Sequence, residues 1–148
     1  MDHSTMDRMG FRSPDGKHLL ELLYLGEVRF GPPYFQAKLD GRVLARRVFG
    51  SRCIWSPDSR FVTLCSWNTI LAGQGPDTSL CVIRVGDERI YDRSRQRCGW
   101  IVPIRFEGSN LVFVRDTSVR TGRMEELEID LDRVREWGPL DRARRLPG

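Results

Sequence analysis

The chain has 148 residues, of which 40% are hydrophobic, and its 24 basic and 20 acidic side chains leave a net charge of +4. That length suits one domain with an ordinary hydrophobic core. No run of about 18 apolar residues occurs, so we expect no membrane-spanning helix. The polar segment 1–10 lacks the apolar centre of a signal peptide, and we therefore expect a cytoplasmic protein.

The first half of the chain predicts strands separated by tight turns. Residues 1–10 are expected to form a flexible N-terminal segment, 11–138 a single all-β domain and 139–148 a polar C-terminal tail. A Ser-Pro-Asp-Gly turn precedes the apolar run His18–Leu25, which is short enough to favour a strand. Alternating residues at Tyr34–Leu39 and the run Arg42–Phe49 flank Asp40-Gly41, a strong hairpin signal.

The second half continues the same pattern. A second unit begins at Cys53 and includes predicted strands at Arg60–Trp67, Ser79–Val85 and Glu88–Tyr91, with loops at Asn68–Thr78 and Asp92–Cys98. A third unit has predicted strands at Trp100–Phe106, Leu111–Arg115 and Met124–Leu131, with a loop at Asp116–Arg123. We expect residues 132–137 to close this third unit.

The turns recur along the chain. Gly16, Ser59 and Ser109 align the three units at intervals of 43 and 50 residues, and periods of this size indicate stacked or radially arranged sheets. The segments Phe11–Lys17 and Trp55–Arg60 carry an aromatic-Ser-Pro-Asp pattern that resembles the blades of TolB-type and WD-repeat-like β-propellers. A closed propeller typically needs at least about four blades. We therefore predict an all-β fold of about three repeated antiparallel sheet units, arranged as a propeller-like stack, a compact sandwich or barrel, or an oligomer that completes a ring.

The sequence carries few groups suited to catalysis. Its two histidines, His3 and His18, offer no base for a His-dependent triad, and no phosphate-binding loop or Gly-x-Ser-x-Gly motif occurs. Asp15 and Asp58 have a structural explanation in their turns. The acidic segment from residue 125 to 132 is expected to face water, although it could hold a cation. We expect a protein that is not an enzyme and has no cofactor or metal.

The four cysteines do not define a metal site. Cys53, Cys65, Cys81 and Cys98 include no Cys-x-x-Cys pair, and three of them lie in strand-like runs. Free cysteine in such a run behaves as a small hydrophobe, so we expect buried thiols. Disulfides and a metal site are the alternatives.

The long loops are the expected place for recognition, because loops on a rigid sheet carry most binding residues. Trp, Tyr and Arg are enriched at interface hot spots. The residues that we predict to bind a partner protein flank these loops: Trp67, Asn68, Tyr91, Arg93, Arg95, Arg97 and Trp100. A core role for the two tryptophans is the alternative.

Three function classes follow. In size and in its lack of catalytic motifs the chain looks like small bacterial immunity proteins, which implies a module that neutralises a cognate toxin or enzyme by surface binding. The second class is a nucleic-acid-binding module, because arginines are frequent in the first two thirds of the chain: Arg42, Arg46, Arg47, Arg52, Arg84, Arg89, Arg93, Arg95 and Arg97. The third class is an enzyme or a sugar-binding domain with a β-sandwich fold.

Overall fold

The computed structural model describes residues 8–28, 31–44, 47–70, 76–117 and 121–140. Its strands are β1 (Arg8–Arg12), β2 (Leu19–Glu27), β3 (Pro33–Leu39), β4 (Arg42–Val43), β5 (Phe49–Trp55), β6 (Phe61–Trp67), β7 (Asp77–Arg84), β8 (Arg89–Arg97), β9 (Trp100–Glu107), β10 (Asn110–Asp116), β11 (Met124–Asp130) and β12 (Gly138–Pro139). A 3-10 turn, η1, covers Leu131–Arg133. No helix in the described part of the chain is long and apolar enough to cross a membrane.

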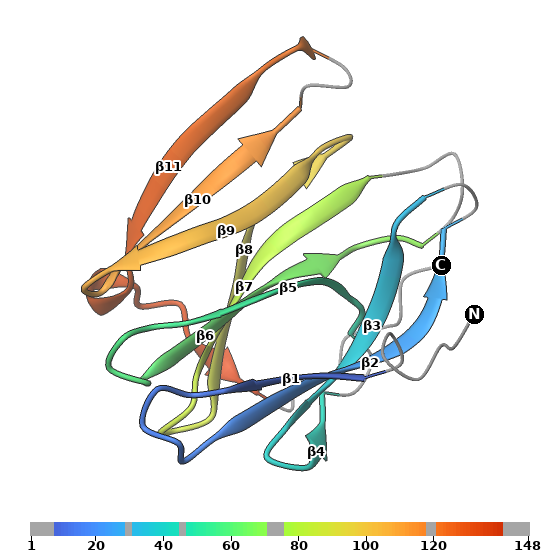
Figure 1. The fold of residues 1–148 in the computed structure, drawn as a ribbon. Helices are drawn as coiled ribbons and strands as arrows, with labels where there is room; N and C mark the ends of the chain where they lie inside the picture. The colour runs from blue at the N-terminus through green and yellow to red at the C-terminus, as the bar shows by residue number, and fades with distance from the viewer. Residues whose placement is uncertain (1–7, 29–30, 45–46, 71–75, 118–120, 141–148) are drawn as a thin grey trace.

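The strands form two antiparallel sheets. The larger runs in the order β1-β2-β3-β5-β6-β7-β8-β12, with β4 beside β3, and the smaller runs β11-β10-β9. In the described residues β3 meets β5 at one pair, Phe35 opposite Phe49, so the larger sheet divides there into two units. The units β1–β4, β5–β8 and β9–β11 confirm the predicted all-β fold of three antiparallel parts (Figure 1).

The middle unit is covered on both faces. Val62 and Leu64 of β6 belong to one core with residues of β2 and β3, whereas Phe61 packs in a second core with residues of β9 and β10. All seven residues of β6 are buried. Alternate residues of a strand point to opposite faces, so β6 has one row of side chains in each core. Figure 1 shows β9–β11, in orange, on one side of this unit and β1–β2, in blue, on the other.

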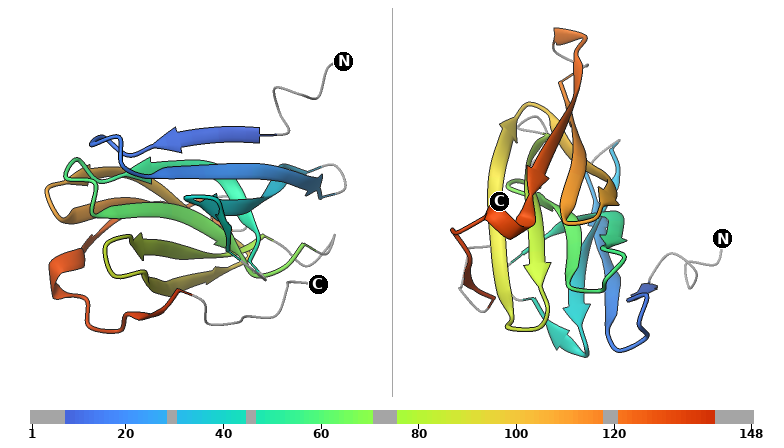
Figure 2. Two further views of the ribbon diagram at one scale, coloured as in Figure 1. Left: turned by 90° about the horizontal axis from the view of Figure 1, so that it is seen from below. Right: turned by 90° about the vertical axis from the view of Figure 1, so that its left-hand side faces the viewer.

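The chain after β11 returns to the middle unit. Trp137 stacks on Phe61, with ring centroids 5.9 Å apart, and β12 then pairs with β8 through Gly138 opposite Ile90. Figure 2 shows this red segment on the side of the molecule away from the β1–β2 hairpin. The final segment therefore joins the second unit, whereas the sequence had predicted that it would close the third.

The two Ser-Pro-Asp turns have the same hydrogen bonds. Ser56 Oγ donates to Asp58 Oδ1 (2.7 Å) and accepts from the Phe61 amide (2.9 Å). In the first unit Ser13 Oγ donates to Asp15 Oδ1 (2.6 Å) and accepts from the His18 amide (3.0 Å). The turns also touch, since the Asp15 amide donates to Ser59 Oγ (3.0 Å).

These turns need a left-handed residue at equivalent positions. Gly16 and Ser59 both have a positive φ, of 75° and 65°, and Gly108 in the turn between β9 and β10 has 62°. Only glycine adopts this region without steric cost. The two Ser-Pro-Asp turns therefore repeat in the backbone, whereas in the third unit the left-handed residue is Gly108 and not Ser109, which the alignment had placed there.

Some expected boundaries differ in the structure. The segment Asp92–Cys98, predicted as a basic loop, lies largely within β8, because it pairs with β7 from Asp77 onward. β1 begins at Arg8, inside the segment expected to precede the domain. Residues 1–7 and 141–148, and parts of the loops Asn68–Thr78 and Asp116–Arg123, lie outside the described residues.

The Ser-Pro-Asp turn leads to a stability prediction. Ser56 is fully buried, and Ser56→Ala leaves the Phe61 amide without its side-chain acceptor. We expect the free energy of unfolding to fall by about 1–3 kcal/mol, the cost of an unsatisfied buried group. Urea denaturation measures this change. Ser51→Ala, at an exposed position, should change stability by less than about 0.5 kcal/mol. Equal effects of the two substitutions would contradict the role of Ser56.

Candidate functional site

A groove runs along β5 where the first strands of the three units come together. At one end it is a hollow of about 450 Å³ between the Pro32-Pro33 segment and β9. At the other end a second hollow, of about 460 Å³, lies between Phe11 of β1, β5 and Ile104 of β9. Ser51 and Arg52 line both hollows, so we treat the two as one feature, the β5 groove.

A bulge in β5 presents these two residues. Phe49 pairs with Ser66 and Cys53 with Leu64, so four residue steps along β5 face two steps along β6. The extra residues cannot all remain in the ladder, and a bulge bends the strand and redirects its side chains. Ser51 and Arg52 are accordingly exposed although β6 beside them is buried.

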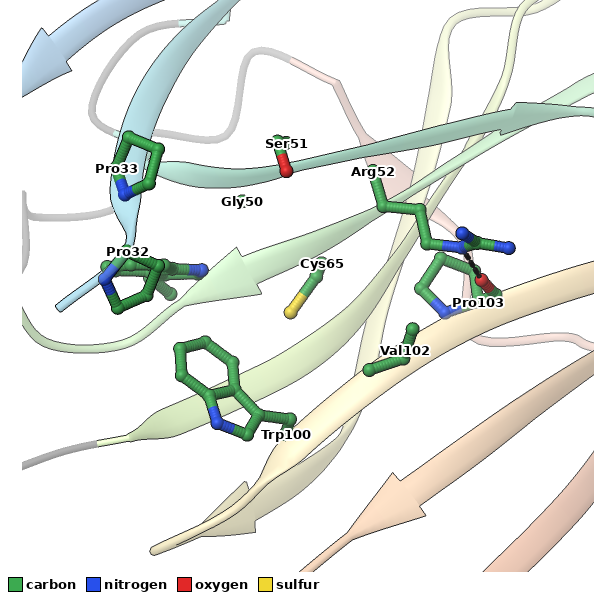
Figure 3. Close-up of a pocket in the computed structure, with 10 residues that line it drawn as sticks. Pro32, Pro33, Gly50, Ser51, Arg52, Cys65, Trp100, Val102 and Pro103 are labelled. Atoms are coloured by element: carbon green, nitrogen blue, oxygen red, sulfur yellow. Dashed lines mark hydrogen bonds between the residues drawn. The ribbon is translucent and has the colours of Figure 1, made fainter. Parts of the chain in front are cut away.

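Arg52 is held in place by β9. Its Nε donates to the Pro103 carbonyl (Figure 3). Its Nη2 donates to the Ile104 carbonyl at 3.3 Å. A guanidinium has five N–H donors, so others remain for a ligand. Among the described residues Arg52 forms no ion pair. The groove therefore contains a fixed cation without a carboxylate partner in the described chain.

The first hollow is mainly apolar. Trp67 and Trp100 meet edge to face with ring centroids 5.4 Å apart, and Tyr34 lies on the other side of Trp67 at 5.8 Å. The hollow is also lined by Pro32, Pro33, Gly50, Val102 and Pro103. Figure 3 shows Pro32, Pro33, Trp100, Val102 and Pro103 around this hollow, and they come from segments that lie far apart in the sequence.

Trp67 explains the glycine in the wall. Its Nε1 is buried and has no hydrogen-bond partner in the described part of the chain. A Cβ at Gly50 would lie 3.1 Å from this nitrogen, closer than most such contacts. Glycine at position 50 therefore lets the indole pack directly beneath the bulge.

Cys65 also lines the first hollow (Figure 3) but is not suited to act as a nucleophile. Burial raises the pKa of its thiol to about 12, and this effect exceeds the opposing hydrogen bonds from Thr78 and the Ile101 backbone. The thiolate is the reactive form of cysteine, and at neutral pH this side chain stays protonated. All four cysteines are free.

The structure places the predicted binding residues in different surroundings. Trp67 and Tyr91 are buried, with 5% and 7% of their surface exposed, and belong to cores. Trp100 is partly buried and lines the groove. The side chain of Asn68 donates to Asp77 and Ser79, both at 2.9 Å, and so fixes the start of β7.

The three arginines lie on β8, not on a loop. Arg93, Arg95 and Arg97 are exposed. Arg95 forms a bidentate pair with Asp77, with Nε–Oδ1 and Nη2–Oδ2 distances of 2.9 and 2.6 Å. That hydrogen bond lowers the pKa of Asp77 despite the partial burial of its carboxyl. Arg95 therefore has a structural partner.

Sequence reasoning missed the centre of the groove. Arg52 was grouped with the arginines of the nucleic-acid alternative, and the Gly31-Pro-Pro33 segment has the features of a plain chain break. Their meeting with Trp100 and Pro103 depends on how the third unit packs on the second. The useful signal would have been an arginine two residues after a glycine in an otherwise mainly apolar strand.

The described residues contain no group of three or more His, Cys, Asp or Glu side chains placed to hold a metal ion. Comparison with known proteins gives no matching family model, no matching curated protein and no matching solved structure.

The Arg95–Asp77 pair predicts a pH dependence of stability. Because the folded-state pKa of Asp77 is depressed, the pair stabilises the protein above the unfolded pKa of about 3.9, and this contribution is lost as pH falls through the folded value. Arg95→Gln should lower the free energy of unfolding by about 1 kcal/mol at pH 7. The difference from wild type should shrink below about pH 4.

Urea denaturation between pH 7 and pH 3 measures that difference. Arg93→Gln is the matched control and should give no such pH-dependent gap. If the difference in the free energy of unfolding between Arg95→Gln and wild type stays constant down to pH 3, Arg95 does not stabilise the charged form of Asp77.

Proposed function

We propose that this chain is a non-enzymatic protein-binding module that acts in the cytoplasm. The observation that carries the proposal is the β5 groove, which combines an apolar lining with the fixed charge of Arg52. Protein interfaces centre on desolvated apolar and aromatic pockets that a few polar groups orient. Here Trp100, Val102 and Pro103 supply the apolar and aromatic pocket, and Arg52 supplies the polar group.

We further propose that the partner is a toxin or enzyme that the module neutralises, as a bacterial immunity protein does. Inhibition of this kind requires only a surface that complements the partner and covers its active site. A rigid scaffold suits that task because little conformational entropy is lost on binding. The middle unit, buried on both faces, gives the groove such a scaffold.

The alternative is nucleic-acid binding through the exposed arginines of β8. Arg93 and Arg97 have exposed side chains on this strand. Phosphate contacts would make such binding strongly dependent on salt. The salt dependence of binding therefore separates the two functions.

A substitution that fills the groove tests the proposal. Val102 lines the first hollow and is partly exposed, so Val102→Arg should leave the fold intact and block the groove with a long charged side chain. Val43→Arg is the matched control, since Val43 is 38% exposed on β4. Affinity purification from the native cell, followed by quantitative mass spectrometry, compares the two variants with wild type.

We expect wild type and Val43→Arg to retain the same protein in similar amounts. Val102→Arg should retain at least tenfold less of it. The retained protein, once purified, should lose its own activity when wild type is added. Retention of nucleic acid that disappears with moderate salt would support the alternative function. Retention of no protein by wild type would contradict the proposal.

A further inference from the structure

We propose that the β5 groove binds an extended segment of the partner in which one carboxylate side chain is flanked on both sides by apolar residues. This inference rests on the proposed protein-binding function and specifies the chemistry of the bound segment. It follows from the order of the groove: an apolar hollow, the Arg52 guanidinium, and a second hollow.

The carboxylate follows from the charge of the groove. Among the described residues that line the two hollows, Arg52 is the one charged residue and none is acidic. Its contacts in the described chain are with two carbonyls, which leave its full positive charge without a counterion. Charge-assisted hydrogen bonds from Arg to a carboxylate are short, directional and stronger than neutral ones. A carboxylate is therefore the group that complements this position.

The guanidinium is also pre-organised. An exposed arginine normally loses rotamer freedom when it binds a ligand, which weakens binding. The bonds to Pro103 and Ile104 hold Arg52 in one place before the partner arrives. The same two bonds explain why arginine suits this position better than lysine, whose ammonium lacks a rigid fork of donors.

The first hollow indicates that the bound segment has apolar residues on one side of its carboxylate. Pro32, Pro33, Trp100 and Val102 offer rings and methyl groups, without a carboxylate or a second cation. Aromatic and proline-lined surfaces of this kind accept proline or aliphatic side chains of an extended chain.

The second hollow indicates that the bound segment also has an apolar residue on the other side of its carboxylate. Phe11, Ile54 and Ile104 line it together with Cys53. Burial raises the pKa of the Cys53 thiol, so this side chain is neutral at physiological pH. An extended chain that passes over Arg52 reaches this hollow with residues beyond the carboxylate. The complementary sequence is therefore apolar, acidic, apolar.

Selection from a random peptide library displayed on phage tests the proposal with the full chain as bait. We expect the enriched peptides to share an Asp or Glu between apolar residues. Arg52→Gln keeps side-chain N–H donors for the β9 carbonyls but removes the charge, and should weaken binding of a selected peptide about tenfold or more. Arg133→Gln is the charge-matched control, because its side chain is 89% exposed on η1, outside the groove, and it should bind as wild type does.

The peptide itself provides a second variant that leaves the protein unchanged. Replacing its acidic residue with the corresponding amide should weaken binding to wild type as much as Arg52→Gln does, and should have no further effect on Arg52→Gln. Enriched peptides without an acidic residue, competition by an oligonucleotide, or no enrichment would each overturn the proposal. If the native partner is still captured in that case, the protein-binding function stands and the assigned chemistry is wrong.

Discussion

The structure depends on the burial of β6 and β7 on both faces. A strand with one row of side chains in each of two cores must be mainly apolar, and β6 and β7 satisfy this with Val62, Leu64, Leu80 and Ile83 among their fully buried residues. Each such residue contributes about 1.5–3 kcal/mol when it leaves water. The outer units therefore stabilise the middle one, and the middle unit fixes their relative positions.

The groove is a consequence of that arrangement. The first strands of the three units, β1, β5 and β9, approach one another on the same side of the molecule (Figure 1). Trp55 Nε1 donates to the Phe11 carbonyl (2.8 Å) and so links β5 to β1, while Arg52 links β5 to β9. The bulge at Gly50–Arg52 opens the strand beside the second of these links. The proposed binding function thus uses residues whose positions are set by the packing of whole units.

The parts of the fold that could be predicted from the sequence are those with a local cause. The alternation in β6 and the two Ser-Pro-Asp turns follow from the residues involved, and the structure has both. Residues 92–97, the second part of β8, were predicted as a loop because their composition is polar and arginine-rich, whereas pairing with β7 extends the strand to Arg97. The groove could not be predicted, since Pro33, Arg52 and Trp100 meet through tertiary packing.

Native-state hydrogen exchange tests the central role of the doubly buried strands most directly. Amides of Phe61–Trp67 and of the central part of β7 should exchange only through global unfolding, with the free energy that urea denaturation gives. Amides of β1 and β11, the edge strands of the two sheets, should open at lower free energy. Exchange of the β6 and β7 amides through a local opening, while β1 or β11 remains protected, would contradict the account.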